Sequence, residues 1–309
     1  MVSIILPNYN HARFLRQRID SILEQTYQDF ELIILDDKSN DESRDIILEY
    51  ASGDKRIKYA FNEVNSGSPF RQWQKGIGMA GGDYIWITES DDFARLTLLE
   101  RLMEALRENE NAGIAYCQSN FVDHSNNLTG NHLKNLSVLD SKLWTNDFCL
   151  PGKELLARHM IIMNIIPNAS GVVFKKFLLD KVDWEEIQSY KLSGDRLFWS
   201  VLLNQSDICF VAESLNYFRM GDTTVRSKHD TTPQYLSERL RVLLALDKMV
   251  TISPEDKMKC IRNFKEHLTK IRKKTGKSLG VVVYWKISTY FYKFDRKNFL
   301  RNLKLLFIR

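Results

Sequence analysis

The 309-residue sequence predicts an α/β protein, with a doubly wound, mainly parallel β-sheet and a C-terminal helical extension. Strand-like runs alternate with helical patterns through about the first 118 residues. Such alternation favours parallel strands connected by right-handed helical crossovers. Acidic residues follow two of the runs, where parallel strands usually present a ligand site. Beyond Pro233 the apolar spacing is helical throughout.

Each predicted element of the first third has its own pattern. β-favouring runs predict strands at residues 2–6, 31–35, 56–60, 84–88 and 113–117. Amphipathic spacing predicts helices between them, at residues 11–25, 41–52, 68–80 and 95–109. In the first helix, one buried face is expected to comprise Phe14, Leu15, Ile19, Ile22 and Leu23.

The alternation stops near residue 119. Residues 119–151 are rich in Asn, Ser and Asp, which predicts loops or a hairpin. Further helices are expected at 152–163 and 196–203, and further strands at 171–174 and 208–211. We therefore expect one domain over residues 1–230, with halves of about 1–118 and 119–230, and a helical region over 231–309.

Composition indicates an ordinary soluble globular protein, with 44% hydrophobic and 27% charged residues. Its four cysteines, Cys117, Cys149, Cys209 and Cys260, are far apart in sequence and form no CxxC pair. This favours a reducing compartment over a zinc site or a disulfide framework. Neither a signal-peptide pattern nor an apolar run of about 18 residues occurs, so we expect a cytoplasmic protein.

The most informative stretch is residues 82–92. The predicted strand at 84–88 runs directly into Glu89, Asp91 and Asp92. Carboxylates this close repel one another unless a cation or a donor-rich ligand neutralises them. Mg²⁺ and Mn²⁺ commonly bridge such carboxylates to substrate phosphates. The alternative is a solvated turn with an acidic cap for the helix that starts near Arg95.

A second acidic pair, Asp36 and Asp37, follows the second predicted strand. A carboxylate there can accept a hydrogen bond from a nucleobase or a ribose hydroxyl. We expect one of the pair to tie loops together and the other to face ligand. Ser39 or Asp41 is expected to cap the next helix.

After the first strand, Pro7 fixes the direction of the chain, Tyr9 could stack on a base, and Asn10 is expected to cap the first helix. The sequence contains no Walker A loop and no GxGxxG motif after a strand. Their absence argues against simple nucleotide hydrolases and dehydrogenases.

Two further segments precede helices. Asn65 and Gly67 come before a helix that carries Arg71 and Lys75, and a helix N-terminus with nearby cations suits a diphosphate. The alternative is an ordinary cap with a solvated face. Asp195 precedes an apolar helix, where it could act as a general base or as the N-cap of that helix.

Together these segments resemble glycosyltransferase family 2, which comprises inverting enzymes with the Rossmann-like GT-A fold. The resemblance runs from Val2 to about Arg226 and depends on several motifs in a family-like order. The motifs are residues 7–10, 21–27, 36–41, 65–67, 72–76 and 82–92.

The resemblance implies roles for particular residues. Asp37 corresponds to the acid that reads a uracil or thymine base, with Asp36 beside it. Asp91 and Asp92 correspond to the DxD-type site that contacts ribose and holds Mn²⁺ or Mg²⁺ on the diphosphate, and Glu89 takes the place of a first Asp. The implied nucleotide-sugar site also includes Pro7, Tyr9, Asn65, Gly67, Arg71 and Lys75.

Asp195 corresponds to the family's general base, usually part of a Glu-Asp pair, and Gly194 stands where the Glu would be. Residues 168–171 resemble the acceptor-side segment. Many relatives carry a His shortly after a Tyr-x-Arg motif, but this chain has none there, so Arg219, Arg226 or His229 would have to substitute.

These features predict an inverting, metal-dependent transfer of a sugar from a UDP- or dTDP-sugar to a hydroxyl of a growing, plausibly lipid-linked glycan. One alternative is a catalytically silent GT-A-like protein that binds nucleotide or glycan as an assembly partner. Another is a sugar-nucleotide pyrophosphorylase, which the lack of a glycine- and basic-rich loop near the N-terminus disfavours.

The net charge of +5 is unevenly distributed. Residues 265–309 hold 13 Lys and Arg against two acids, a net charge of +11, so residues 1–264 carry −6. Helical spacing predicts one cationic face, formed by Lys286, Lys293, Lys297, Arg301 and Lys304. Such a helix favours an anionic membrane surface. A solvated helix on the catalytic domain or a partner-binding helix is the alternative, and nucleic acid is not expected as a partner.

Overall fold

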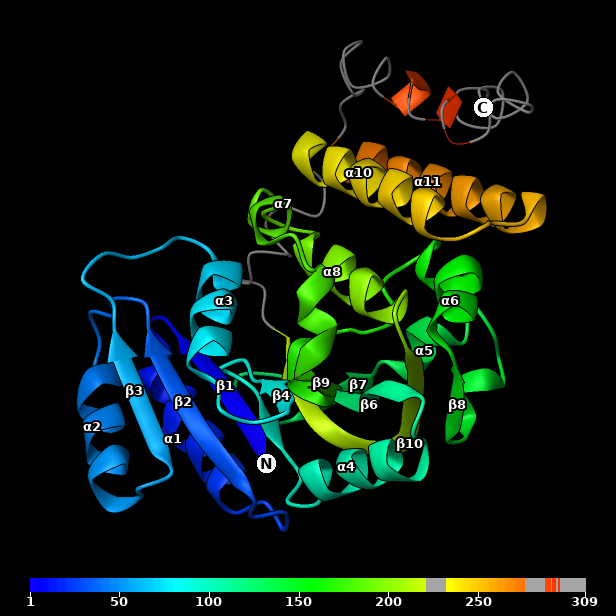
Figure 1. Ribbon diagram of the computed structural model, residues 1–309. Coiled ribbons are helices and arrows are strands. Elements are labelled where there is room, and N and C mark those ends of the chain that lie inside the picture. The colour runs from blue at the N-terminus through cyan, green and yellow to red at the C-terminus, as the bar shows by residue number, and fades with distance from the viewer. Residues whose placement is uncertain (221–231, 276–286, 290, 293, 295–309) are drawn as a thin grey trace.

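A computed structural model describes residues 1–220, 232–275, 287–289, 291–292 and 294. The strands in this part of the chain form one ten-stranded sheet, in which the order of the main path is β3-β2-β1-β4-β9-β6-β10-β5. Six strands run in one direction, because β9 is antiparallel to both β4 and β6 while the pairs β1–β2, β1–β4, β2–β3 and β6–β10 are parallel. The predicted mainly parallel α/β sheet is therefore confirmed (Figure 1).

The strands are β1 (Val2–Asn8), β2 (Phe30–Asp36), β3 (Ile57–Phe61), β4 (Tyr84–Ile87), β5 (Phe93–Ala94), β6 (Ala112–Val122), β7 (Leu128–Asn131), β8 (Phe148–Pro151), β9 (Val172–Lys175) and β10 (Asp207–Arg219). The α-helices are α1 (Ala12–Leu23), α2 (Ser43–Gly53), α3 (Pro69–Met79), α4 (Leu98–Glu108), α5 (Leu133–Leu136), α6 (Gly152–Leu155), α7 (Trp184–Gln188), α8 (Gly194–Leu203), α10 (Pro233–Met249) and α11 (Pro254–Thr275).

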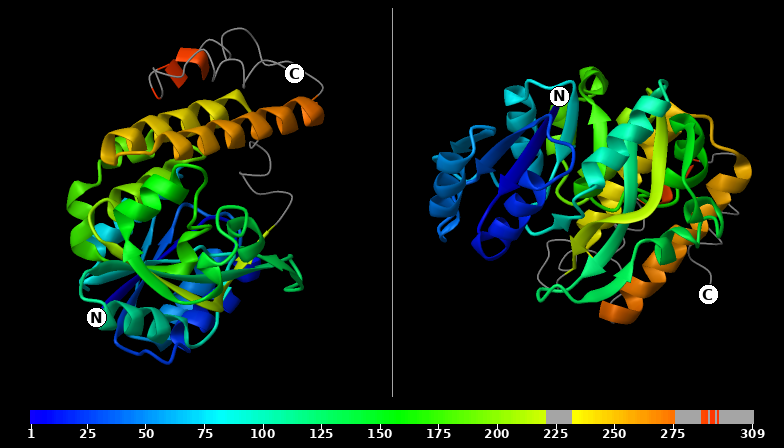
Figure 2. Two further views of the ribbon diagram at one scale, coloured as in Figure 1. Left: turned by 90° about the vertical axis from the view of Figure 1, so that its right-hand side faces the viewer. Right: turned by 90° about the horizontal axis from the view of Figure 1, so that it is seen from below.

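Helices cover both faces of the sheet, because alternate strand residues point to opposite sides. Ile4 and Leu6 of β1 face a core that includes residues of α1, α2 and α4. Ile5, between them, faces the other core, which continues through α3 and α8 into α10 and α11. The described part of the C-terminal region therefore shares a hydrophobic core with residues 1–220. Figures 1 and 2 show α10 and α11 side by side across the end of the molecule near α7 and α8.

The second half departs from the predicted pattern in detail. The polar region after residue 119 contains the β6–β7 hairpin, as one of the two expectations had it. The helix predicted at 152–163 is a short α-helix followed by a π-helical turn, Leu156–Met160. The strand predicted at 208–211 extends to Arg219, and Cys209 in it lies opposite Cys149 of β8 with the two Sγ atoms 2.6 Å apart. All four cysteines are free, and the sequence separation of this pair did not predict their contact.

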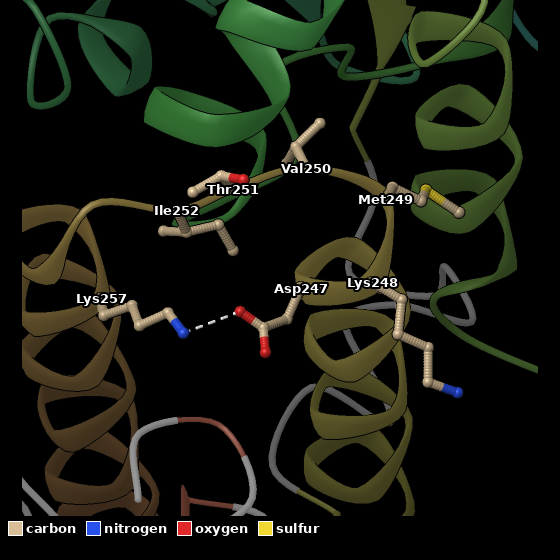
Figure 3. A pocket seen from close by; sticks show the side chains of 7 residues that line it. All are labelled: Asp247, Lys248, Met249, Val250, Thr251, Ile252 and Lys257. Carbon is tan, nitrogen blue, oxygen red and sulfur yellow. Dashed lines mark ion pairs between the residues drawn. The ribbon is translucent and has the colours of Figure 1, made fainter. Parts of the chain in front are cut away.

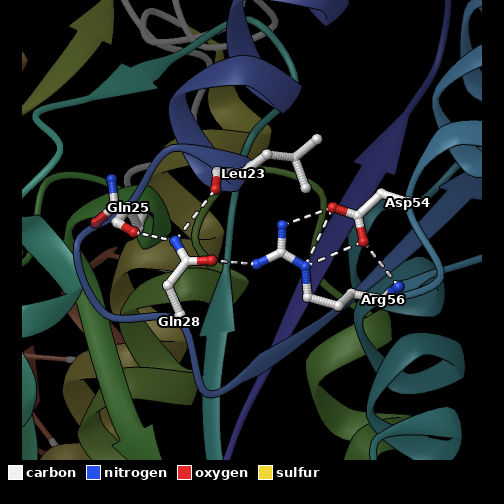
Figure 4. A network of polar contacts seen from close by, with 5 residues as sticks. All are labelled: Leu23, Gln25, Gln28, Asp54 and Arg56. Carbon is white, nitrogen blue, oxygen red and sulfur yellow. Dashed lines mark hydrogen bonds and ion pairs between the residues drawn. The ribbon is translucent and has the colours of Figure 1, made fainter.

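Polar contacts stabilise two separate parts of the molecule, one near the start of β3 and one at the turn between α10 and α11. Arg56, just before β3, forms an ion pair with Asp54 and donates to Gln28 Oε1 at 2.6 Å, and Gln28 in turn donates to the end of α1 (Figure 4). At the turn between α10 and α11, Lys257 and Asp247 form an ion pair of 2.9 Å across a small pocket (Figure 3).

The helices in the described ranges are either too short or too polar to span a lipid bilayer. The predicted cationic helix at the C-terminus, Arg226 and His229 lie outside the described residues.

Candidate active site

The carboxyl ends of β1, β2 and β4 lie side by side at one edge of the sheet, because β1 pairs in parallel with both neighbours. Thr88 N donates to Ile5 O at 2.8 Å, which extends the β4 pairing by one residue. The acidic turn at residues 89–92 therefore emerges beside the end of β1. Glu89, Asp91 and Asp92 thus lie at the sheet edge that the sequence predicted.

Asp92 is buried and well supplied with hydrogen-bond donors, so it is not the exposed helix cap of the alternative. Its Oδ2 accepts from Ser170 Oγ at 2.7 Å and from Asn168 Nδ2, and its Oδ1 accepts from Arg219 N at 2.8 Å. These three bonds leave one lone pair on Oδ1. Asn168 and Ser170, which resembled an acceptor-side segment, here secure the acidic turn.

Glu89 and Asp91 differ from Asp92, since no other described residue donates a hydrogen bond to either carboxylate. Burial, followed by repulsion from Asp91 and Asp92, raises the pKa of Glu89 to about 8. Burial also raises the pKa of Asp91. The described part of the chain contains no group of three or more His, Cys, Asp or Glu side chains that is arranged to hold a metal ion. One or two carboxylates completed by substrate phosphates is nevertheless a common arrangement for Mg²⁺.

Arg18 of α1 lies beneath this acidic turn and was missed by the sequence analysis. Its side chain is 0% exposed, its guanidinium lies 5.2 Å from the Trp86 ring, and its three nitrogens have no hydrogen-bond partner among the described residues. Burial lowers the pKa of Arg18 to about 10, and the charges of Asp92, Glu89 and Asp91 oppose that shift. An arginine on the apolar face of the first helix, between Leu15 and Ile19, was the available signal.

Asp36 and Asp37 both accept hydrogen bonds from the protein. Asp36 Oδ1 accepts from Asn8 Nδ2 at 2.8 Å, and its Oδ2 accepts from Ser39 N at 2.9 Å, which closes the turn after β2. Asp37 Oδ1 accepts from Asn62 Nδ2, Ser66 N and Gln72 Nε2 at 2.6–3.0 Å. The expectation that only one of the two ties loops together is wrong, because both do.

The segment after β1 exposes Tyr9, which is 48% accessible, while Pro7 is buried within the strand. Asn10 adopts a left-handed conformation with φ of 55° and accepts a hydrogen bond from Asn40 N at 2.8 Å. Asp41 accepts instead from Ala12 N (2.9 Å) and from Ser43 N (3.1 Å), at the starts of α1 and α2. The prediction that Asn10 caps α1 is therefore wrong, and Asp41 serves the first turns of both helices.

The loop before α3 lies close to Asp37. Asn65 Oδ1 accepts from Gly67 N at 2.7 Å, and Gly67 has φ of 66°, a conformation that favours glycine. Arg71 and Lys75 are exposed on the first two turns of α3, where Arg71 donates to Ser66 O and Lys75 donates to Asn62 Oδ1. The two cations thus lie beside a helix N-terminus, as predicted.

Asp195 lies in the first turn of α8, whose N-cap is Ser193, so the alternative that Asp195 caps the helix is wrong. Its Oδ2 accepts from Asn164 Nδ2 at 3.0 Å, and its side chain lines a cavity of about 430 Å³. The charge of Asp195 contributes to the raised pKa of Glu89. Asp195 on α8 therefore lies close enough to the turn after β4 for its charge to act on Glu89.

Arg219 is the last residue of β10. Its guanidinium is buried and donates to Asp91 O at 2.7 Å, to Asp123 O, to Asn126 Oδ1 and to Gln17 Oε1. It also packs over the Phe14 ring at 4.4 Å. Arg219 therefore holds the acidic turn in place, with most of its N–H groups engaged by the protein.

This fold, with an acidic turn after β4 and a separate carboxylate on α8, is that of the GT-A glycosyltransferases. The profile of Glycosyl transferase family 2 matches residues 3–164, more than half of the chain, and the chain belongs to this family.

Individual proteins give the range of similarity. An uncharacterized glycosyltransferase from Haemophilus influenzae is 36% identical over 154 residues, which cover 45% of this chain and 61% of that protein. GalNAc(5)-diNAcBac-PP-undecaprenol beta-1,3-glucosyltransferase from Campylobacter jejuni is 27% identical over 48% of this chain and 47% of its own length. The chain thus spans less than two thirds of either relative. TarS 1–349 from S. aureus, in complex with UDP-GlcNAc, has the same fold, with a TM-score of 0.69, 16% identity, and coverage of 95% of this chain and 80% of that one.

Proposed function

We propose that this glycosyltransferase transfers a hexosyl or deoxyhexosyl group, with inversion, from a UDP- or dTDP-sugar to a hydroxyl of a growing glycan. The observation that carries the proposal is the separation of the acids: Asp195 lines the cavity beside α8, while Glu89, Asp91 and Asp92 follow the end of β4. Such separation suits a base that faces the acceptor and carboxylates that face a diphosphate. The Campylobacter relative, whose name describes transfer to an undecaprenol-linked glycan, supports a glycan acceptor.

The donor would bind along the carboxyl ends of β1, β2 and β4. Asp91 and Glu89 fit a Mn²⁺ or Mg²⁺ ion, because they are half-buried carboxylates that repel each other and have no protein donor of their own among the described residues. Asp92 has one lone pair left for the same ion. When bound, the cation would neutralise charge on the diphosphate. Nucleotide contacts are assigned to Pro7, Tyr9, Asp36, Asp37, Asn65, Gly67, Arg71, Lys75 and Asp91.

In the reaction, Asp195 would take the proton from the acceptor hydroxyl. The oxygen would then attack the anomeric carbon from the side opposite the diphosphate, forming the new glycosidic bond. The bond from that carbon to the diphosphate oxygen would break, and the nucleoside diphosphate would leave with the electron pair. Asn164, which donates to Asp195, would orient the base.

The location proposed for this reaction is the cytoplasmic face of a membrane. The net charge of +11 on residues 265–309 supports a peripheral contact with anionic lipid. Flotation with anionic and with neutral vesicles tests this, and binding that is unchanged on removing residues 277–309 would contradict it.

The donor proposal is tested by thermal melting and product assays with a panel of nucleotide sugars, each with Mn²⁺ and with EDTA. We expect UDP or dTDP compounds to raise Tm only with the metal, and one sugar donor to be hydrolysed or transferred. A metal-dependent rise in Tm without any turnover across the panel would instead favour a silent nucleotide-binding partner.

A further inference from the structure

The cavity beside Asp195 is lined by residues within 121–220 of the α/β part of the chain and by residues of helices α10 and α11. Its walls come from β6 and β10, from residues 132–135 and 163–167, from the start of α8, and from α10 and α11. Phe121 and Phe218 lie on one side, with ring centroids 5.9 Å apart. Tyr235 and His267, from α10 and α11, contribute another ring pair at 5.3 Å. Aromatic rings with nearby amides are a suitable lining for a sugar.

The same cavity carries an excess of positive charge. Among the described residues that line it are three cations, Arg196, Arg239 and Lys270, and one carboxylate, that of Asp195. Within the described ranges, no carboxylate lies within ion-pair distance of any of these three cations. The charge of Asp195 offsets that of Arg196 only in part, and cations without an ion-pair partner attract an anionic ligand group.

The two arginines are held rigidly. Arg196 donates through Nε to Met160 O at 3.1 Å, and Arg239 donates through Nη2 to Asn263 Oδ1 at 2.9 Å. The Arg239 guanidinium also lies 5.4 Å from the Phe264 ring. Burial, followed by repulsion from Arg239, lowers the pKa of Arg196 to about 10. A bound anion would relieve this repulsion, and fixed arginines need little ordering to bind it.

We propose that this cavity is the acceptor site and that it takes an acceptor bearing a phosphate group, which Arg239 and Lys270 bind while a sugar hydroxyl of the acceptor faces Asp195. The inference rests on the proposed transferase function and adds the chemical class of the acceptor. It also gives α10 and α11 a direct role in acceptor recognition.

The test uses the full chain and two probes, glucose 1-phosphate and glucose, titrated by ligand-observed NMR in the presence of saturating UDP and diamagnetic Mg²⁺ to block the donor site. We expect glucose 1-phosphate to bind about tenfold more tightly than glucose. Lys270→Gln and Arg239→Gln should each weaken the phosphorylated probe about fivefold or more and leave glucose unchanged. Lys273→Gln, an exposed cation on the same helix outside the cavity lining, is the matched control and should bind as the unaltered protein does.

Equal affinity for the two probes would overturn the proposal, as would unchanged phosphate binding in both cavity variants or an equal loss in the control. Binding seen only without UDP would assign the phosphate to the donor site and overturn it as well. Lys270 is exposed, so its variant keeps the test valid if Arg239→Gln fails to fold. If geranyl diphosphate competes with glucose 1-phosphate, the phosphate of the acceptor is lipid-linked. If it does not compete, the phosphate is on the glycan. Either outcome agrees with the proposal. Probe binding needs no turnover, so an inactive protein that passes this test would contradict only the transferase function.

Discussion

Glu238 of α10 accepts a hydrogen bond from the backbone N–H of Ser193 at 3.0 Å, two residues before Asp195. The same buried carboxylate accepts from the N–H groups of Lys191 and Leu192, at 3.1 and 2.8 Å. Three successive backbone donors around one carboxylate form a strong, localised anchor. Helix α10 therefore holds the turn from which α8 and its acid begin.

Removing this anchor should loosen the turn. Glu238→Ala leaves three N–H groups without their acceptor, which should cost about 3 kcal/mol of unfolding free energy. Displacement of Asp195 should lower kcat about tenfold or more, while the donor KM stays the same. Denaturant unfolding and steady-state kinetics measure both. Glu255→Ala, on the exposed surface of α11, is the control, and an equal loss there would refute the specific role of Glu238.

Asp195→Asn should abolish transfer, because the amide cannot take the acceptor proton. We expect turnover to fall about 10²–10⁴-fold with nucleotide binding retained, as measured by product formation and by calorimetry with UDP and Mn²⁺. Asp180→Asn, at an exposed position, makes the same chemical change away from the site. Normal turnover in Asp195→Asn would contradict the assignment of Asp195 as the general base.

Asp91→Asn should weaken metal-dependent nucleotide binding. With Mn²⁺ present, the affinity for UDP is expected to fall about tenfold, since a neutral amide is a poorer ligand for a hard cation. In EDTA the variant and the unaltered protein should bind UDP equally weakly. Asp83→Asn, exposed just before β4, serves as the comparison. A similar loss in EDTA would show that Asp91 contacts the nucleotide without a metal.

Arg18→Met should make the protein depend more on a bound cation. Arg18 is a buried positive charge beneath Glu89, Asp91 and Asp92, so its loss leaves their repulsion less well compensated. We expect the rise in Tm on adding Mn²⁺ to be larger in Arg18→Met than in the unaltered protein. Arg18→Lys, which keeps the charge, should lie between the two. An identical rise in all three proteins would exclude a countercharge role.

Gly194→Ala should destabilise the start of α8. A Cβ there would stand 2.6 Å from the Phe70 ring and 3.1 Å from Ile187 O, and overpacking of this kind costs about 1–3 kcal/mol. The penalty should shrink in a Phe70→Leu background, as a double-mutant cycle would show. Gly78→Ala in α3 meets no atom within 4 Å and should be neutral or stabilising. If both alanines had the same effect, close packing would not explain the glycine.

Sequence patterns predicted the first half closely, because its elements depend on local periodicity. The strand expected at 31–35 is Phe30–Asp36, and the helix expected at 68–80 is Pro69–Met79. Prediction was poorer where pairing decides the structure. The long strand β10 extends through two shifts in register with β6 between Val211 and Asn216, and such irregularities have no local signature.

Short-range patterns along the chain predicted the main alternation of strands and helices in the first third, and they predicted acids at strand ends, namely Glu89, Asp91, Asp92, Asp36 and Asp37. The three-dimensional fold established which carboxylates accept hydrogen bonds from the protein and which have no donor from another described residue, because donors such as Ser170 and Arg219 come from distant segments. It also decided that Arg18 lies beneath the acids and that α10 supports Asp195. Burial and hydrogen-bond partners across the core depend on three-dimensional packing, which no local pattern specifies.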